Sequence, residues 1–151
     1  MKRLALPLLC VAALLAADPG RDAWELLSNA ASALTESNSR SFQSYDNSTS
    51  FLSNFDPKMP GYAEIRDDVS ALLREAELSC SIDLVSNEGD AATRELVVDW
   101  TLDIALLQPG PTVAATRRKQ RVTIRMEKRK KNWVIVGFEP KGFFSVPEGG
   151  K

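Results

Sequence analysis

The stretch Arg121–Pro140, RVTIRMEKRKKNWVIVGFEP, decides how the rest of this 151-residue chain is interpreted. Val122, Ile124 and Met126 alternate with polar residues, which is the period of two that a half-buried β-strand requires. After a basic turn the chain continues with Trp133–Phe138, which is rich in β-branched and aromatic residues and typical of a second strand. We therefore expect a β-hairpin with a very basic turn.

Two further strands are predicted before this hairpin. Even-numbered positions carry apolar residues in two segments, 78–84 and 96–106, and the turn residues 87–90 separate them. We expect Leu78 to lie opposite Trp100, and Trp100 opposite Ile124. This register keeps the even-numbered apolar residues on one buried face, as a single sheet requires.

On the other face of this sheet, aspartate and arginine side chains are expected to meet across neighbouring strands. In the register above, Asp103 lies opposite Arg121 and Asp99 lies opposite Arg125. Opposite charges at such positions stabilise a solvated sheet face. We therefore interpret both aspartates as structural rather than catalytic.

Three amphipathic or polar helical segments are predicted before the strands, at Arg21–Glu36, Ser41–Leu52 and Tyr62–Ala76. Asp22 is the expected N-cap of the first segment, because Glu25 follows at the spacing of a capping box. Helices that precede a run of antiparallel strands indicate an α+β fold, with the helices on one face of a four-stranded sheet.

The first seventeen residues have the layout of a secretory signal peptide. Lys2 and Arg3 precede the apolar run Leu4–Ala17, which is shorter than the roughly 20 residues that a bilayer span needs. We therefore expect a signal peptide at 1–17, one domain at 18–147 and a flexible tail at 148–151. The protein is then exported, to the periplasm or the extracellular space, without a stable membrane span; a retained anchor is the alternative.

The charge of the chain is slightly negative but unevenly distributed. Removing Lys2 and Arg3 leaves 17 basic against 20 acidic side chains, a total that does not suggest nucleic-acid or membrane binding. Nine basic residues nevertheless fall between Arg117 and Lys131. Nucleic acid and anionic lipid are the partners such a run invites; few aromatic residues interleave it, which argues against nucleic acid. A solvated face with some affinity for an anion or a partner is our interpretation.

The final strand carries apolar residues on both of its faces. Trp133 and Ile135 occupy one face, and Val134, Val136 and Phe138 occupy the other. One face covers the core. The other is expected to pack against two aromatic residues of the tail, at 143 and 144, or to form a contact between two copies of the chain.

Helices followed by long antiparallel strands, with RVTIRMEK, a short turn and Trp133-Val-Ile-Val at the end, resemble the nuclear transport factor 2-like superfamily. This is the cystatin-like, cone-shaped α+β fold of SnoaL-like and ketosteroid isomerase-like domains, with three N-terminal helices on a curved four-stranded sheet. Here the turn at 129–132 is more basic than usual and lacks glycine. The resemblance implies a pocket between the helices and the concave sheet. The residues expected to line it are Trp24, Phe42, Tyr45, Trp100, Leu102 and Ile124.

Catalysis in such a pocket would need a carboxylate or a tyrosine, because the chain contains no histidine. Tyr45, Asp46 and Tyr62 are the candidates for a donor and base of the isomerase type, although their spacing matches no catalytic motif. No metal site and no cofactor are expected.

The sequence therefore favours a non-catalytic module that binds a small apolar molecule or a protein, with a homodimer as one form of the latter. The alternatives are an enzyme of the SnoaL or ketosteroid isomerase type, and an assembly partner in the cell envelope. The residues expected to contact a protein partner are Arg117, Arg118, Lys119 and Arg121.

Overall fold

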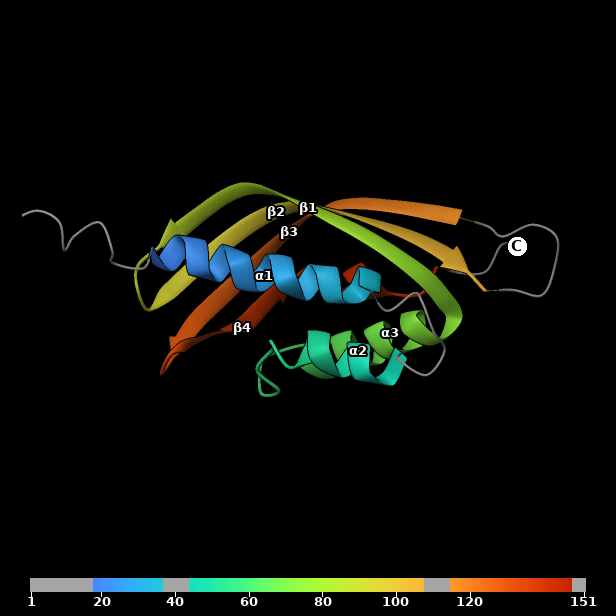
Figure 1. Ribbon diagram of the computed structural model, residues 1–151, viewed down its shortest axis with the longest axis horizontal. Coiled ribbons are helices and arrows are strands. Elements are labelled where there is room, and N and C mark those ends of the chain that lie inside the picture. The colour runs from blue at the N-terminus through green and yellow to red at the C-terminus, as the bar shows by residue number, and fades with distance from the viewer. Residues whose placement is uncertain (1–17, 37–43, 108–114, 148–151) are drawn as a thin grey trace, which may run out of the picture.

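The computed structural model describes residues 18–36, 44–107 and 115–147, without the side chains of residues 36 and 44–47. The expected signal peptide, the tail at 148–151 and Phe42 lie outside this part of the chain. Helices come first in the chain and strands follow (Figure 1). The elements are α1 (Pro19–Glu36), α2 (Ser44–Leu52), α3 (Tyr62–Glu75), β1 (Ala76–Gly89), β2 (Thr93–Leu106), β3 (Ala115–Arg129), β4 (Asn132–Glu139) and the 3₁₀ helix η3 (Lys141–Phe144).

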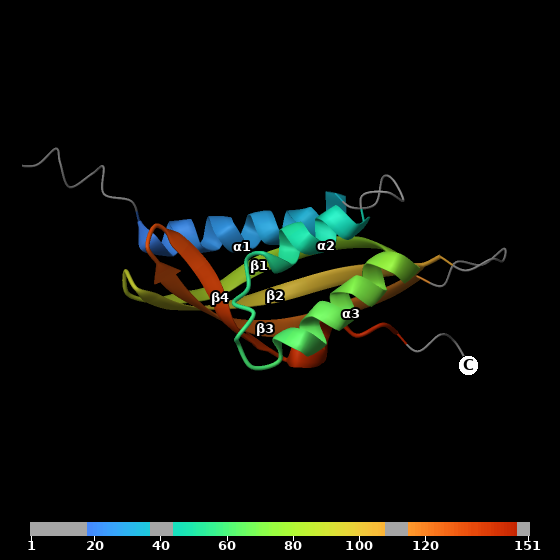
Figure 2. The ribbon, with the colours of Figure 1, turned by 90° about the horizontal axis from the view of Figure 1, so that it is seen from below.

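The four strands form one antiparallel sheet in the order β1-β2-β3-β4. The sheet curves over the helices, with α1 lying along β1 and with α2 and α3 below the concave face (Figures 1 and 2). This arrangement confirms the predicted α+β class with a four-stranded antiparallel sheet and helices.

The register of the sheet differs from the prediction by four residues in both of the pairs we predicted. Leu78 pairs with Ile104 instead of Trp100, and Trp100 pairs with Gln120 instead of Ile124. The apolar residues keep their face, because a displacement by an even number of residues does not turn a strand over.

The turn between β1 and β2 explains the displacement of the first pair, β1 and β2. β1 continues through Gly89, although residues 87–90 were expected to form the turn, and a bulge at Val85 shifts the pairing between Leu84 and Ser86. The Asp90 carboxylate accepts hydrogen bonds from the backbone N–H of Thr93, at 2.7 Å, and of Ala92. Gly89 has φ 140°, and a Cβ there would meet the Thr93 carbonyl oxygen at 2.2 Å, so the turn requires glycine.

Helix α1 begins earlier than predicted. Asp18 is the N-cap in place of Asp22: its side chain accepts a hydrogen bond from the Gly20 N–H at 3.0 Å, and Pro19 occupies the first helical position. Proline is favoured there, because its missing N–H would have no partner within the helix. Asp22 lies in the first turn, where a negative charge interacts favourably with the helix dipole.

The last strand also departs from strict alternation. Met126 pairs with Ile135 while Arg125 pairs with Gly137, so Val136 is an extra residue in β4. Phe138 therefore joins Ile135 on the buried face, with 1% of its surface exposed, and does not share a face with Val136 as predicted. The tail aromatics at 143 and 144 pack in the same core, on the concave side of the sheet.

Candidate functional site

The space between the helices and the concave sheet contains packed aromatic side chains. Phe144 lies within ring-centroid distances of 5.0–5.5 Å of four other aromatic residues. Phe51 comes from α2, Trp100 from β2, Phe138 from β4 and Phe143 from η3. Each of these rings is at most 1% exposed. In the part of the chain described, this aromatic cluster occupies the place where the resemblance implied a pocket.

The residues expected to line the pocket belong to this core or to its border. Trp100, Leu102 and Ile124 are completely buried and pack in the core. Trp24 on α1 is only partly buried against the same core. The remaining two, Phe42 and the side chain of Tyr45, lie outside the described part of the chain.

Thr35 and Cys80 form polar contacts at the border of the core. The Cys80 backbone N–H donates to the Thr35 hydroxyl at 3.0 Å, and the Cys80 thiol donates to the Ala31 carbonyl at 2.9 Å. Burial raises the pKa of the Cys80 thiol. The thiol is therefore protonated and a poor nucleophile.

Of the expected catalytic residues, only Tyr62 has a described side chain. Tyr62 begins α3 and lines a groove of about 450 Å³ between α2 and α3. Five of its nine described lining residues carry a hydroxyl group, and none of the nine is a carboxylate. The side chain of Asp46 is not described. The other lining residues are Ser48, Thr49, Leu52, Ser53, Phe55, Pro57, Arg66 and Ser70.

Ion pairs cross from β2 to β3 on the outer face of the sheet. Asp103 pairs with Arg117 at 2.8 Å, and Asp99 pairs with Arg121 at 3.0 Å. The prediction of aspartate–arginine pairs is confirmed, but the expected arginine partners were wrong because of the register difference. Hydrogen bonds from these arginines lower the pKa of both aspartates, so the carboxylates stay ionised.

Arg118 points in the opposite direction from its neighbours. Its guanidinium donates a hydrogen bond to the Phe143 carbonyl and lies near Asp68 of α3. Burial lowers the pKa of Arg118, and the Asp68 charge opposes that shift. Of the four residues expected to contact a partner, Arg117, Arg118 and Arg121 are therefore engaged within the fold, and Lys119 is exposed on the outer face.

A shallow hollow of about 400 Å³ lies on the outer face near the β1–β2 and β3–β4 turns. Arg125 lies across Gly137, where a Cβ would approach the Arg125 Cβ to 3.2 Å. Val136, the extra residue of β4, also lines the hollow. The sequence pattern did not predict this feature, because the bulge that places Val136 in its lining leaves no local signal. The remaining lining residues are Glu88, Gly89, Thr93, Arg94, Glu95, Met126 and Glu127.

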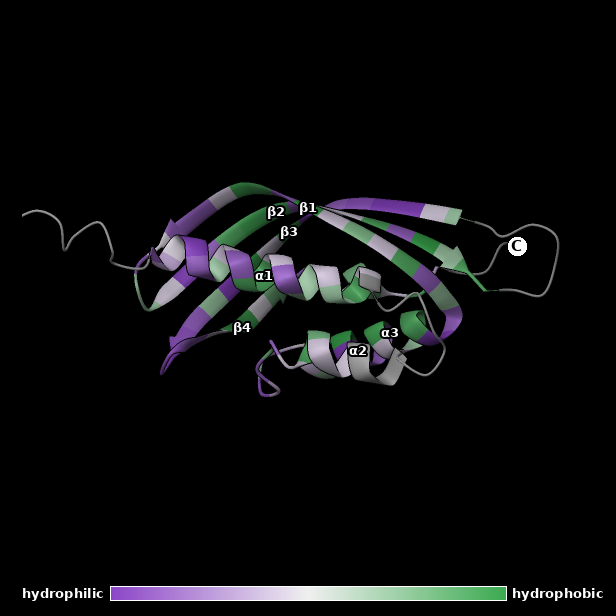
Figure 3. Ribbon diagram, viewed as in Figure 1, coloured by the Kyte–Doolittle hydropathy of each residue, from purple (hydrophilic) through white to green (hydrophobic). Residues whose placement is uncertain are grey.

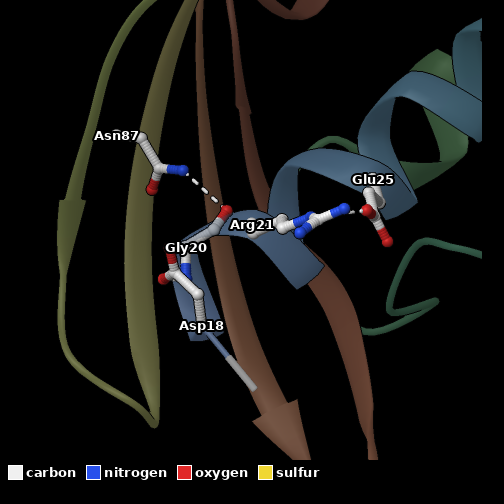
Figure 4. Close-up of polar contacts among 5 residues, drawn as sticks. All are labelled: Asp18, Gly20, Arg21, Glu25 and Asn87. Carbon is white, nitrogen blue, oxygen red and sulfur yellow. Dashed lines mark hydrogen bonds and ion pairs between the residues drawn. The ribbon is translucent and has the colours of Figure 1, made fainter. Parts of the chain in front are cut away.

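A polar clamp fixes the beginning of α1 to the end of β1 (Figure 4). The Asn87 amide donates to the Gly20 carbonyl at 2.7 Å, and Arg94 donates in turn to the Asn87 side-chain oxygen at 2.7 Å. On the helix itself, Arg21 pairs with Glu25 at 3.0 Å. The clamp holds the first turn of α1 at the end of the molecule where the β1–β2 turn lies (Figure 1).

The second half of the basic run forms the tip of the β3–β4 hairpin. Arg129 pairs with Asp56 at 2.7 Å and with Glu127 at 3.3 Å. Lys128, Lys130 and Lys131 are exposed. These four basic residues, 128–131, are called the hairpin tip below.

Neither a metal centre nor a transmembrane helix is found in the residues that the structure describes. No group of three or more His, Cys, Asp or Glu side chains there could hold a metal ion. None of the described helices is long and apolar enough to cross a bilayer.

Comparisons with known proteins identify the fold. No protein-family model matches the sequence, and no curated protein matches it. A designed protein of the nuclear transport factor 2 type aligns with a TM-score of 0.50 and 10% identity, over 78% of this chain and 96% of its own. A Xanthomonas campestris protein described as a calcium/calmodulin dependent protein kinase II association domain aligns with a TM-score of 0.51 and 14% identity, over 78% and 83%. The chain therefore has the nuclear transport factor 2-like fold.

Proposed function

We propose that the chain is an exported, non-catalytic interaction module that works through its outer surface. The observation that carries this proposal is the aromatic cluster, which fills the concave side of the sheet with side chains such as Trp100 and Phe144. A binding or catalytic pocket inside the cone would need both free volume and a placed polar group. The described interior supplies packed rings instead.

The outer face of the sheet is the surface that fits a partner, and we propose a second copy of the chain. Val97 and Val136 are half-buried there, beside acidic residues on β2 and basic residues on β3. A face that carries both signs of charge together with apolar groups can be self-complementary under two-fold symmetry. In this proposal the aromatic packing of the concave face stabilises the fold, and the charged outer face binds the partner.

Native mass spectrometry with light scattering tests this proposal. We expect a dimer without a bound small molecule for the wild type, and a monomer for Val97→Glu, which places a charge in the centre of the contact. Ala63→Glu is the matched control, because it adds the same charge at an exposed position of α3 and should leave the dimer intact. A wild-type monomer that carries an apolar small molecule would refute the proposal.

A second candidate function is binding of a small polar molecule in the groove between α2 and α3. The specific observation is the Tyr62 phenol, which shares the groove with the Arg66 side chain and several hydroxyl groups. A mass adduct on the purified protein that disappears in Tyr62→Phe would support this function. The same adduct in both proteins would exclude Tyr62 as a ligand-contacting residue.

A further inference from the structure

The hairpin tip carries positive charge that the surrounding structure does not neutralise. Among the described residues, Lys128, Lys130 and Lys131 form no ion pair, whereas Arg129 is paired with two carboxylates. Lys58 is also exposed and lies close to Arg129, because both residues contact Asp56. The other half of the same basic run, on the upper part of β3, is largely neutralised by β2.

Lys130 at the tip adopts a backbone conformation that normally favours glycine. Arg129 pairs with Asn132, so only Lys130 and Lys131 connect the strands. Lys130 has φ 58°, in the left-handed region where two-residue hairpin turns normally place glycine. A non-glycine residue in such a position costs on the order of 1 kcal/mol, and residues of this kind cluster at functional sites. The turn thus keeps a charged side chain at the expense of its own stability.

The tip also lies at a defined end of the molecule. The β3–β4 turn and the first turn of α1 are at the same end in both views (Figures 1 and 2). Residues 1–17, with Lys2, Arg3 and the apolar run Leu4–Ala17, join the domain at Asp18 on this end. A chain delivered to or held at a membrane by these residues would therefore meet the bilayer with the hairpin tip nearby.

From the uncompensated charge, the strained lysine and the position of the tip, we infer that the hairpin tip binds the anionic headgroups of a phospholipid bilayer. Lysine ammonium groups attract lipid phosphates as point charges, and each lysine near an anionic surface strengthens binding roughly five-fold. Nucleic acid fits the tip less well, because its nearest aromatic residue, Trp133, is only 4% exposed and offers no stacking platform. This inference goes beyond the proposed function, and it does not require the second copy of the chain.

Co-sedimentation with lipid vesicles tests the inference. The readout is the ratio of affinities for two vesicles, one of pure phosphatidylcholine and one with about 30 mol% phosphatidylglycerol, at about 0.05 M salt. The ratio cancels any binding that the apolar run contributes equally to both vesicles, and the comparison with a variant that keeps Lys2 and Arg3 isolates the share of the hairpin tip. We expect the combined changes Lys128→Gln, Lys130→Gln and Lys131→Gln to lower the ratio roughly 100-fold.

Two matched variants separate charge from folding. Lys119→Gln removes one exposed charge from the other half of β3 and should leave the ratio within about two-fold of the wild type. Lys130→Gly removes one charge from the tip but relieves the strained turn, so it should lower the ratio roughly five-fold while raising stability.

Two results would overturn the inference. One is a wild-type ratio near unity, or a ratio that the triple variant does not change. The other is binding of a DNA duplex at the tip in the absence of any preference for anionic vesicles, which would assign the charge to nucleic acid.

Discussion

The two faces of the sheet are built from neighbouring residues yet have opposite properties. Trp100 is completely buried against aromatic rings, whereas Asp99 next to it pairs with Arg121 at the surface. The alternation of apolar and polar residues along the strands is visible in Figure 3. Contacts on the concave face remove large apolar areas from water, while exposed ion pairs contribute little to stability. The outer face therefore presents polar and charged groups to solvent, whereas the inner face is filled by the core.

The largest effect is expected at the centre of the aromatic cluster. Phe144→Ala should lower the free energy of unfolding by about 3–5 kcal/mol, because it leaves a cavity among four packed rings. Urea denaturation followed by tryptophan fluorescence measures this change. Val146→Ala, at a partly buried residue beyond η3, is the control and should cost much less. A loss below about 1 kcal/mol for Phe144→Ala would show that η3 does not complete the core.

Two nearby arginines of β3 allow the stability contributions of the two faces to be compared, because their side chains lie on opposite faces of the sheet. Arg118→Ala should destabilise the fold by about 1–3 kcal/mol, since it removes the hydrogen bond to the Phe143 carbonyl and leaves Asp68 without its nearest positive charge. Arg121→Ala removes only an exposed pair and should have a smaller effect. Equal losses in the same denaturation experiment would contradict the division between the faces.

The turn between β3 and β4 belongs to neither face of the sheet. A substitution there is expected to raise the stability of the fold, whereas the substitutions above lower it. Lys130→Gly is expected to raise the free energy of unfolding by about 1 kcal/mol, because glycine adopts the positive φ without strain. Lys131→Gly is the control: no positive φ occurs there, so the added chain flexibility should make that variant slightly less stable. The two melting temperatures, measured side by side, check the prediction. A lower melting temperature for Lys130→Gly would contradict it.

The smallest effect concerns pH on the outer face. The folded-state pKa values of Asp99 and Asp103 are lowered, chiefly by hydrogen bonds from Arg121 and Arg117. A lowered acid pKa stabilises the fold above the unfolded pKa, and this contribution disappears as the pH falls through the folded value. Stability should therefore decline below about pH 4, and less steeply in the double variant Asp99→Asn, Asp103→Asn. Identical acid profiles for both proteins, from thermal melts, would show that the pairs contribute nothing.

The sequence alone determined the order of the elements and the face of nearly every strand residue. Period-two alternation in β1, β2 and β3 separates apolar from polar residues whatever the register, so Leu102 and Ile124 were correctly expected on the concave side. Register itself did not follow from the pattern, because a displacement by four residues leaves the same side chains inside. Between β1 and β2, local turn chemistry at Asp90 and the bulge at Val85 accompany the observed register.

The candidate surfaces were less accessible from the sequence, because they depend on contacts between distant segments. The basic run looks continuous from Arg117 to Lys131, but aspartates of β2 pair with two of its arginines and Arg118 binds the Phe143 carbonyl of η3. Among the described residues, the three lysines of the hairpin tip form the largest adjacent group without an ion pair. Likewise, the extra residue Val136 in β4 reverses the direction of the side chains that follow it, so Phe138 points into the core. Residue type and spacing determine which side chains lie on each face of a strand. Only the tertiary structure determines which of these side chains have a hydrogen-bond or ion-pair partner, because the partners come from elsewhere in the chain.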